Sequence, residues 1–245
     1  MIRLTRSRRR GAGEYVLAYG CGLNNTLRVN DGCGLNNKYD SVMIVIGVCG
    51  GIASGKSLVA AELERLGAVW INADRLGHEV LAESEVKRLI RDRWGSVVFN
   101  SDGSVNRAAV AKIVFAAPPA GPVELQHLEK LTHPRIGEKL RERIEQLRRQ
   151  AAPAVVLDAP VMFRAGWNRL CDRLLFVDAP RQLRLERARS RGWTEEEFDA
   201  REAAQESLTW KQQQSDCVIN NSHTPAHTAH QVQQFWDSLS HDFPS

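Results

Sequence analysis

Residues 43–58 place a glycine-rich loop between an apolar run and a helical pattern, and this order constrains the fold more than any other feature. The run Met43–Val48 has the length and the continuous apolar character of a strand buried on both faces. The segment Gly50-Gly-Ile-Ala-Ser-Gly-Lys-Ser57 matches GxxxxGK[ST] at every fixed position. An amphipathic helical pattern follows over residues 58–66, and Gly67 gives it a natural end. A strand, a glycine loop and a helix in this order are typical of a phosphate-binding loop.

The residue types of this loop suit nucleotide phosphates. Glycine lets the backbone curl around an anion, so that successive N–H groups and the helix N-terminus face it. The Lys56 ammonium can reach the β- and γ-phosphates, and the Ser57 hydroxyl can ligate Mg²⁺. Asp158 ends a later apolar run, where a carboxylate ligand of Mg²⁺ would lie. The residues expected to contact the nucleotide are Gly50, Gly51, Ile52, Ala53, Ser54, Gly55, Lys56, Ser57 and Leu58.

Further apolar runs of strand length alternate with helical patterns along the chain. The runs cover residues 68–72, 154–158, 173–178 and 216–220, and residues 136–147 carry apolar side chains at helical spacing. Strands that alternate with helices form βαβ units and a parallel sheet. The sequence therefore predicts an α/β fold with a five-stranded parallel sheet flanked by helices.

Asp74 lies just beyond the second predicted strand. Ligands of open parallel sheets bind beyond the carboxyl ends of the strands, so a carboxylate here can orient and accept the proton of an attacking hydroxyl. The alternative is that Asp74 caps the following helix, a common use of Asp after a strand. His78 would share a helical face with Asp74. Local sequence leaves both roles of Asp74 open.

Arginines cluster between the fourth and fifth predicted strands. They are Arg181, Arg184, Arg187, Arg189 and Arg191. Guanidinium groups at this place suit a lid that closes over nucleotide phosphates and stabilises the transferring charge. The alternative is a basic helix whose arginines are solvated. The number of arginines makes at least one functional contact the expected outcome.

The charge of the chain is unevenly distributed. Residues 1–42 hold seven basic and three acidic residues, whereas the remaining chain has 26 of each sign and is neutral. A basic body that would bind nucleic acid is therefore not expected.

Five scattered cysteines without CxxC spacing indicate a reducing compartment, with neither disulfides nor a zinc site. With no apolar run long enough to span a membrane and no signal-peptide core, we expect a cytoplasmic protein without membrane partners.

Residues 1–42 differ in character from the rest of the chain. They lack a sustained apolar period and contain a short repeat, Cys21–Asn25 and Cys33–Asn37. A basic arm or a targeting peptide is one interpretation, and a tail before a fold that begins at Met43 is the other. Low apolar content favours the tail, because it cannot offset the entropy of ordering. We predict an extension over 1–42 that is disordered or upstream of the true start, a domain over 43–240 and a tail over 241–245.

The C-terminal region predicts one more helix. Thr224 and Pro225 are suited to its N-cap and its first position, and residues 232–239 would carry its packing face. Of three nearby histidines, only His227 and His230 would share a helical face with each other. Metal binding by these histidines is therefore not expected.

Several segments in a fixed order resemble motifs of the dephospho-CoA kinase family. That family usually shows GxTGGIGSGKS, a DAD strand end, an HP dipeptide, a D-x-PLLFE segment and a late Q…(S/D)DxVIxN segment. The similar segments here are, in order, Gly47–Ser57, Asn72–Asp74, His133-Pro134, Asp158–Arg164, and Gln205 with Ser215–Asn221. The resemblance covers essentially all of residues 43–240, and five matches in the same order are highly specific.

The resemblance implies a phosphate-loop kinase fold with a helical substrate region and an arginine-bearing lid. It implies ATP-dependent phosphorylation of the ribose 3′-hydroxyl of dephospho-CoA, the last step of CoA synthesis, with Mg²⁺ as a cofactor. It gives Asp74 the catalytic role, together with Lys56 of the loop and the lid arginines Arg187 and Arg191. Substrate contacts are expected from Asp74, His78 and His133.

Three residues depart from the family pattern. Asn72 replaces the first Asp of the DAD element, which removes one charge but leaves Asp74 in place. Arg164 replaces the acidic residue that usually ends PLLFE and reverses the charge near the expected acceptor site. Leu58 stands where the loop often has Thr, a position that contributes chiefly its backbone N–H.

Two other functions are compatible with the loop. One is a kinase of the same fold that acts on another small acceptor, such as a nucleoside monophosphate. The other is a nucleotide-binding regulator that has lost catalysis. Retention of Lys56, Ser57, Asp74 and Asp158 argues against the regulator.

Overall fold

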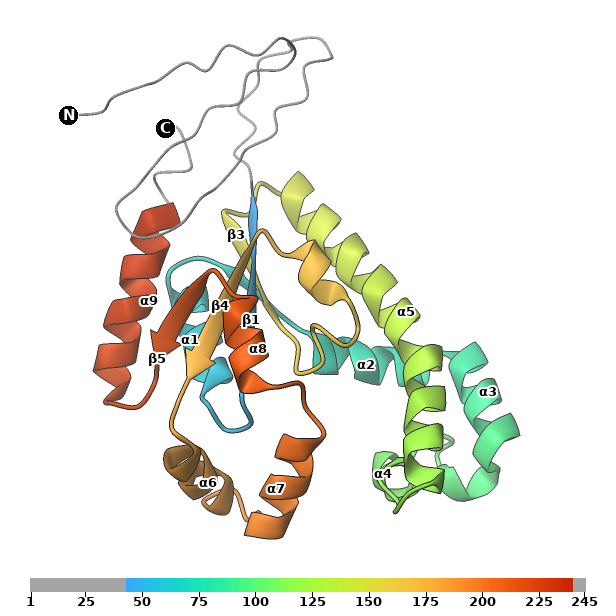
Figure 1. Cartoon of the computed structure of the whole chain (residues 1–245). Helices are drawn as coiled ribbons and strands as arrows, with labels where there is room; N and C mark the ends of the chain where they lie inside the picture. Colours follow the sequence, from blue (N-terminus) through green and yellow to red (C-terminus); the bar gives the residue numbers. More distant parts are fainter. Residues whose placement is uncertain (1–42, 240–245) are drawn as a thin grey trace, which may run out of the picture. The chain divides into compact units, whose positions relative to one another are not determined.

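A parallel five-stranded sheet lies at the centre of the computed structural model, which describes residues 43–239 (Figure 1). Its strands are β1 (Ile44–Gly50), β2 (Val69–Asn72), β3 (Ala154–Asp158), β4 (Arg173–Asp178) and β5 (Cys217–Asn220). They lie in the order β2-β3-β1-β4-β5, and every neighbouring pair is parallel. The predicted α/β fold is therefore confirmed. The predictions for residues 1–42 and 241–245 lie outside the described residues.

Helices cover both faces of the sheet, which explains why β1 is apolar without interruption. Ile44, Ile46 and Val48 point to the face covered by α1 (Lys56–Arg65) and α9 (Pro225–Leu239). Met43 and Val45 point to the opposite face, because successive side chains of a strand alternate. The helices α2 (Ala73–Ala82) and α5 (Ala120–Arg149) pack there. Two buried faces require apolar residues at every position of the strand.

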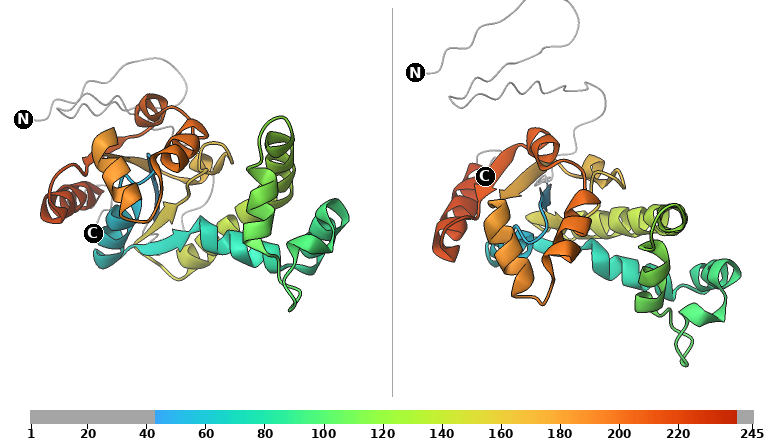
Figure 2. Two further views of the ribbon diagram at one scale, coloured as in Figure 1. Left: turned by 90° about the horizontal axis from the view of Figure 1, so that it is seen from below. Right: turned by 60° about the horizontal axis from the view of Figure 1, so that its bottom comes forward.

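A helical region extends from this second face of the sheet (Figure 2). It comprises α2, α3 (Ser84–Trp94), the short 3-10 helix η1 (Ser96–Val98), α4 (Arg107–Val114) and the first half of α5. The helix predicted around residues 136–147 is the second half of α5, whose Ile136, Leu140, Ile144 and Leu147 are all buried. Of the helices in residues 43–239, none combines the length and apolar character needed to cross a bilayer.

A helical hairpin follows β4 and lies below the sheet in the view of Figure 1. It consists of α6 (Arg181–Arg189) and α7 (Glu195–Ala203), which we call the lid hairpin. Phe198 of α7 is fully buried against Leu185 and Ala188 of α6. Helix α8 (Leu208–Gln213) returns the chain to β5, and the 3-10 helix η2 (Trp167–Leu170) precedes β4.

Candidate active site

The predicted phosphate loop connects β1 to α1, and two glycines with positive φ shape it. At Gly50, φ is 147° and a Cβ atom would lie 2.5 Å from the carbonyl oxygen of Val177. At Gly55, φ is 99° and a Cβ atom would lie 2.0 Å from Nδ2 of Asn221. Both positions therefore exclude a side chain on steric grounds as well as through their backbone conformation.

The loop leaves polar groups available to an anion. Among residues 43–239, the backbone N–H groups of Gly55, Lys56 and Ser57 donate to no carbonyl, as expected for the first turn of a helix. The buried hydroxyl of Ser54 likewise has no hydrogen-bond partner in that part of the chain. Convergent N–H groups at a helix N-terminus fit a bound phosphate.

Replacing Gly55 with alanine is expected to weaken ATP binding by about tenfold or more, because left-handed backbone costs an L-residue about 1–2 kcal/mol and the Cβ would displace Asn221. Calorimetric titration with a non-hydrolysable ATP analogue measures this. Gly103→Ala is the matched control, since Gly103 has a φ of 75° but open space around its Cβ position. Equal ATP affinity in wild type and Gly55→Ala would contradict the loop geometry.

Lys56 begins α1 and turns back over the loop. Its ammonium donates to the carbonyl oxygen of Gly51 at 2.9 Å and to that of Gly50 at 3.4 Å. Burial lowers the pKa of Lys56, and the nearby Asp158 carboxylate offsets part of this effect. The charges of Lys211 and Arg191 lower the pKa further. An ammonium in such surroundings gains a large electrostatic stabilisation from phosphate.

Asp158 ends β3 between the ends of its two neighbouring strands. It lies beside Val48 of β1 and Asn72 of β2 in the sheet register and is buried. Burial raises the pKa of Asp158, Lys56 lowers it, and the negative charge of Asp74 raises it again. Asp158, Lys56 and Asp74 are therefore close enough to interact electrostatically, as parallel strand ends predict.

Asp74 is the second residue of α2, and its carboxylate is exposed. The N-cap of α2 is Asn72, whose Oδ1 accepts hydrogen bonds from the backbone N–H groups of Asp74 at 2.9 Å and Arg75 at 3.2 Å. The proposal that Asp74 caps the helix is therefore wrong, because the preceding amide already does so. Within residues 43–239, no side chain forms a hydrogen bond with the Asp74 carboxylate.

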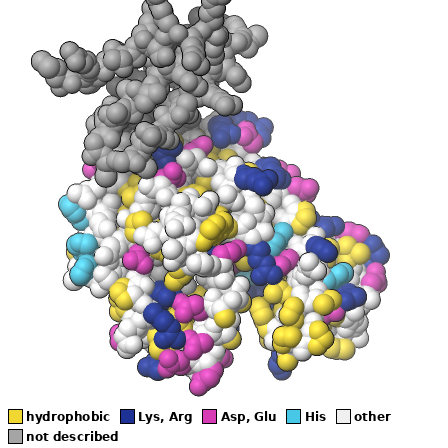
Figure 3. All heavy atoms as spheres, in the orientation of Figure 1, with side chains coloured by type: hydrophobic (Ala, Val, Ile, Leu, Met, Phe, Trp, Pro, Cys, Tyr) yellow, Lys and Arg dark blue, Asp and Glu magenta, His cyan; other side chains and the backbone are white. Residues whose placement is uncertain are grey.

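Four of the five arginines predicted for the lid make contacts of two kinds. Arg181, Arg184 and Arg189 pair with carboxylates on α7, and the two signs of charge lie intermixed at the lower edge of Figure 3. Arg187 instead faces the loop, donating to the carbonyl oxygens of Ser54 at 3.1 Å and Asn221 at 2.8 Å. Arg191 is exposed just beyond α6. The alternative of a basic helix with solvated arginines is therefore wrong for the four arginines that form these ion pairs or hydrogen bonds.

The two predicted substrate histidines differ in surroundings. His78 is exposed on α2, one turn after Asp74. His133 is half-buried on α5 and packs edge-to-face on Trp167 with 5.5 Å between ring centroids. Burial lowers the pKa of His133, and the charge of Arg164 lowers it further. His133 therefore has a packing contact in addition to any contact with a substrate.

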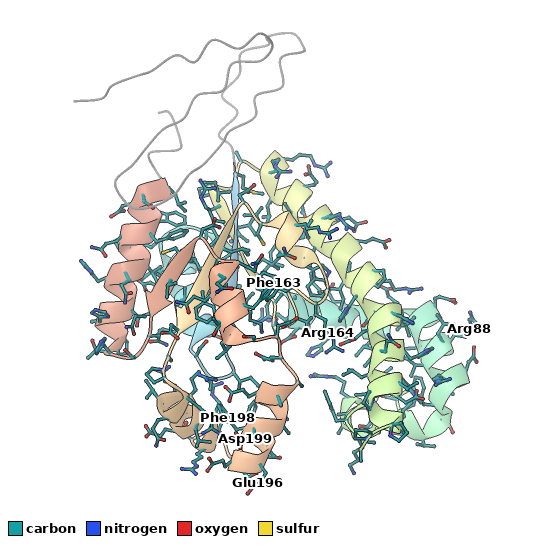
Figure 4. The ribbon with its side chains drawn as sticks, viewed as in Figure 1. Arg88, Phe163, Arg164, Glu196, Phe198 and Asp199 are labelled. Atoms are coloured by element: carbon teal, nitrogen blue, oxygen red, sulfur yellow. The ribbon has the colours of Figure 1, made fainter. Side chains whose placement is uncertain are left out.

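Arg164 lies between the loop after β3 and helix α5 (Figure 4). Its guanidinium pairs with Glu129 of α5 at 2.8 Å and remains 41% exposed. The reversed charge at this position is thus neutralised by a carboxylate from the helical region. Glu129 has a raised pKa because of burial, which Arg164 partly offsets.

Several residues of the site could not be identified from local sequence. Asn221 donates from Nδ2 to the Ser54 carbonyl at 2.7 Å, and its Oδ1 accepts from the Thr228 hydroxyl at 2.8 Å. Arg184 is buried under Gly51, where it donates to the Ala179 carbonyl at 3.0 Å. Asn221 lies in the late segment that resembles the family motif, and this resemblance was the only sequence feature that pointed to it. Arg184 was indistinguishable from the other lid arginines.

Metal ligation by protein side chains alone has no support in the described part of the chain. Residues 43–239 contain no group of three His, Cys, Asp or Glu side chains placed to hold an ion. His223 and His227 pack edge-to-face at 4.9 Å between ring centroids. The pair therefore forms an aromatic contact at the start of α9.

Comparisons with known proteins agree on one family. The family model described as dephospho-CoA kinase matches residues 44–226. A dephospho-CoA kinase of Symbiobacterium thermophilum is 40% identical over 197 residues, covering 79% of this chain and 80% of that protein. A dephospho-CoA kinase of Geobacter metallireducens is 40% identical over 196 residues, covering 79% and 96% of the two chains.

Solved structures show the same fold. The crystal structure of TT1252 from Thermus thermophilus is 29% identical, with a TM-score of 0.68 over 83% of this chain and 99% of that chain. A dephospho-CoA kinase from Campylobacter jejuni is 22% identical, with a TM-score of 0.56 over 80% and 97%. With the family model covering residues 44–226 and two relatives that are 40% identical and covered to 80% and 96% of their length, the chain belongs to the dephospho-CoA kinase family.

Proposed function

We propose that this protein transfers the γ-phosphoryl group of ATP to the ribose 3′-hydroxyl of dephospho-CoA, giving CoA and ADP. Membership of the family supports this reaction. The observation that carries it is the position of Lys56, Asp158 and Asp74 at the carboxyl ends of three neighbouring strands: Asp158 ends β3 beside Val48 and Asn72, while Lys56 follows β1 and Asp74 follows β2. A kinase needs a phosphate cradle and a carboxylate for the acceptor in this arrangement.

In this proposal, loop residues 50–58 hold the ATP phosphates through backbone N–H groups. Lys56 neutralises charge on the β- and γ-phosphates, and Arg187 and Arg191 do so from the lid hairpin. The Arg187 contact with the Ser54 carbonyl supports its placement at the loop. Fixed positive groups of this kind lower the barrier because they do not have to reorganise as charge moves during transfer.

Asp74 would accept the proton of the attacking 3′-hydroxyl. Its exposed carboxylate, free of hydrogen bonds from residues 43–239, supports this role. His78 and His133 would contribute to the acceptor side from α2 and α5. General-base assistance of this kind typically contributes a factor of about 10²–10⁴ in rate.

The Ser57 hydroxyl and the Asp158 carboxylate fit a hard divalent cation, since both offer oxygen ligands and Asp158 is a buried carboxylate whose charge Lys56 offsets only in part. These two residues would hold Mg²⁺, which when bound neutralises charge on the phosphates. We assign this chemistry to a domain over residues 43–240 and place the protein in the cytoplasm, acting on small molecules without nucleic acid or membrane partners.

A panel of acceptors tests the proposed function. With ATP as donor, we expect kcat/KM for dephospho-CoA to exceed that for nucleoside monophosphates by about a hundredfold or more, and the product to carry its new phosphate on the 3′-oxygen by ³¹P NMR. Preference for a nucleoside monophosphate would favour a neighbouring kinase. ATP binding without turnover of any acceptor would favour the regulator.

A further inference from the structure

Arg184 on α6 is a buried guanidinium to which the proposed reaction gives no role. Its side chain is only 5% exposed, although arginine is rarely buried unless its charge is paired. Here Nη1 forms an ion pair with Oε1 of Glu202 on α7, and Nε donates to the carbonyl oxygen of Ala179 at 3.0 Å. Arg184 is therefore held from two sides, by the chain that enters the lid hairpin and by its second helix.

The guanidinium held in this way lies directly against the phosphate loop. A Cβ atom at Gly51 would lie 2.9 Å from Nη1 of Arg184, 3.2 Å from its Cζ and 3.3 Å from its Cδ. The carbonyl oxygen of Gly51 accepts from the Lys56 ammonium at 2.9 Å and from the N–H of Ser54 at 3.3 Å. The position of Gly51 therefore affects both the loop lysine and the turn of the loop.

The middle of the loop also rests on the lid hairpin. Ala53 has a φ of 56°, a left-handed conformation that is unfavourable for an L-residue. Its side chain is buried in one hydrophobic cluster with Leu185 and Ala188 of α6 and Phe198 of α7. Strained backbone persists only where its surroundings support it, and this cluster gives Ala53 such support.

Arg187 contacts the loop from the same face of α6. It follows Arg184 by three positions, and residues at this spacing are neighbours on a helix surface. Its guanidinium donates to the carbonyl oxygen of Ser54. Gly51, Ala53 and Ser54 are thus all supported by the lid hairpin, in addition to any contact that the hairpin makes with phosphates.

We propose that Arg184 is a positioning residue of the phosphate loop: held by Glu202 and the Ala179 carbonyl, its guanidinium supports Gly51 in the conformation that binds the nucleotide phosphates. Because it is buried, Arg184 acts through the backbone of Gly51 and not as a ligand of the phosphates. Glu202 contributes by keeping the guanidinium in place. The proposal rests on the proposed function for the identity of the nucleotide, whereas the contact with Gly51 belongs to the protein alone.

Amide hydrogen exchange of the full chain, followed by NMR without nucleotide, measures this support. The Ser54 N–H is the reporter, because its hydrogen bond to the Gly51 carbonyl closes the turn of the loop. In Arg184→Met we expect Ser54 to exchange about tenfold faster than in wild type, since local opening governs exchange. Arg189→Met is the matched control: Arg189 lies on the same helix but pairs with Glu195, and its loss should leave the Ser54 rate unchanged.

Calorimetric titration with a non-hydrolysable ATP analogue measures the consequence for the nucleotide. We expect Kd to rise about tenfold in Arg184→Met, because the loop is no longer preorganised, and to stay unchanged in Arg189→Met. Glu202→Met should raise Kd similarly. Glu202→Gln should keep Kd close to the wild-type value, because its amide oxygen still accepts from the guanidinium. Arg184→Met and Glu202→Met combined should have no larger effect than Arg184→Met alone, since the two residues act as one unit.

Steady-state kinetics separate positioning from a general loss of stability. In Arg184→Met, KM for ATP should rise with Kd, while KM for the acceptor stays unchanged. A role in stability alone would lower the melting temperature without this division between the two substrates.

An unchanged Ser54 rate or an unchanged Kd in Arg184→Met would overturn the proposal, whatever the melting temperature. A lower Kd in Glu202→Met would also overturn it, because the unpaired guanidinium would then attract the phosphates directly. If Arg184→Met does not fold, Glu202→Met and Glu202→Gln decide the question, and equal Kd values in these two variants would contradict the proposal. A wild-type protein that does not bind the ATP analogue would instead refute the proposed function, and the exchange rates would still test Arg184.

Discussion

Replacing Lys56 with alanine is expected to lower kcat by about a hundredfold or more, because a preorganised charge at the transferring group is lost. The ammonium also donates to the carbonyl oxygens of Gly51 and Gly50, so its loss removes contacts that shape the loop. Arg187 remains bonded to the far side of the loop at Ser54, where it cannot take over the position of the lysine.

Steady-state turnover with saturating ATP and dephospho-CoA measures this effect. Lys112→Ala, an exposed lysine on α4, is the matched control and should keep wild-type activity. Thermal unfolding of both variants checks that the fold is intact. Activity of Lys56→Ala within about threefold of wild type would show that the loop lysine takes no part in the transfer.

Asp74→Asn is expected to lower turnover by about 10²-fold or more while leaving ATP affinity unchanged. The isosteric amide cannot accept the proton of the 3′-hydroxyl, but the phosphates are held elsewhere, by the loop and Lys56. Stability should change little, because Asn72 and not Asp74 caps α2. Turnover with saturating dephospho-CoA and calorimetric ATP binding measure the two quantities.

Asn72→Ala separates capping from catalysis on the same turn of helix. It removes the hydrogen bonds to the N–H groups of Asp74 and Arg75, which should cost about 1 kcal/mol of stability. The Asp74 carboxylate is retained, so turnover should fall far less than in Asp74→Asn. Near-normal turnover in Asp74→Asn would show that Asp74 takes no part in the proton transfer.

The elements that sequence predicted well are those determined by neighbouring residues. The strand ending at Gly50, the glycine loop and the amphipathic start of α1 follow one another within about two dozen residues, so local pattern and fold agree. The parallel sheet followed from the alternation of strands and helices, and its carboxyl ends brought Asp74 and Asp158 to one edge. Topology alone predicts this proximity.

The elements that sequence could not predict depend on partners distant along the chain. Lys211 is an ordinary lysine in a polar helix until the fold buries it next to Lys56, 155 positions earlier in the sequence. The division of the lid arginines likewise depends on which of them face the acids of α7. In the sequence, Asn72 was notable only because it lacks the charge of the family's Asp. In the structure it is the N-cap of α2, because its backbone is extended and its side-chain oxygen accepts hydrogen bonds from the first turn.

The hydrogen bonds that join Thr228, Asn221 and Ser54 make the entry to α9 part of the nucleotide site's support. Thr228 is fully buried on α9, the helix that follows the edge strand β5. A substitution of Thr228 or Asn221 therefore reaches the phosphate loop through the carbonyl oxygen of Ser54, without touching a ligand.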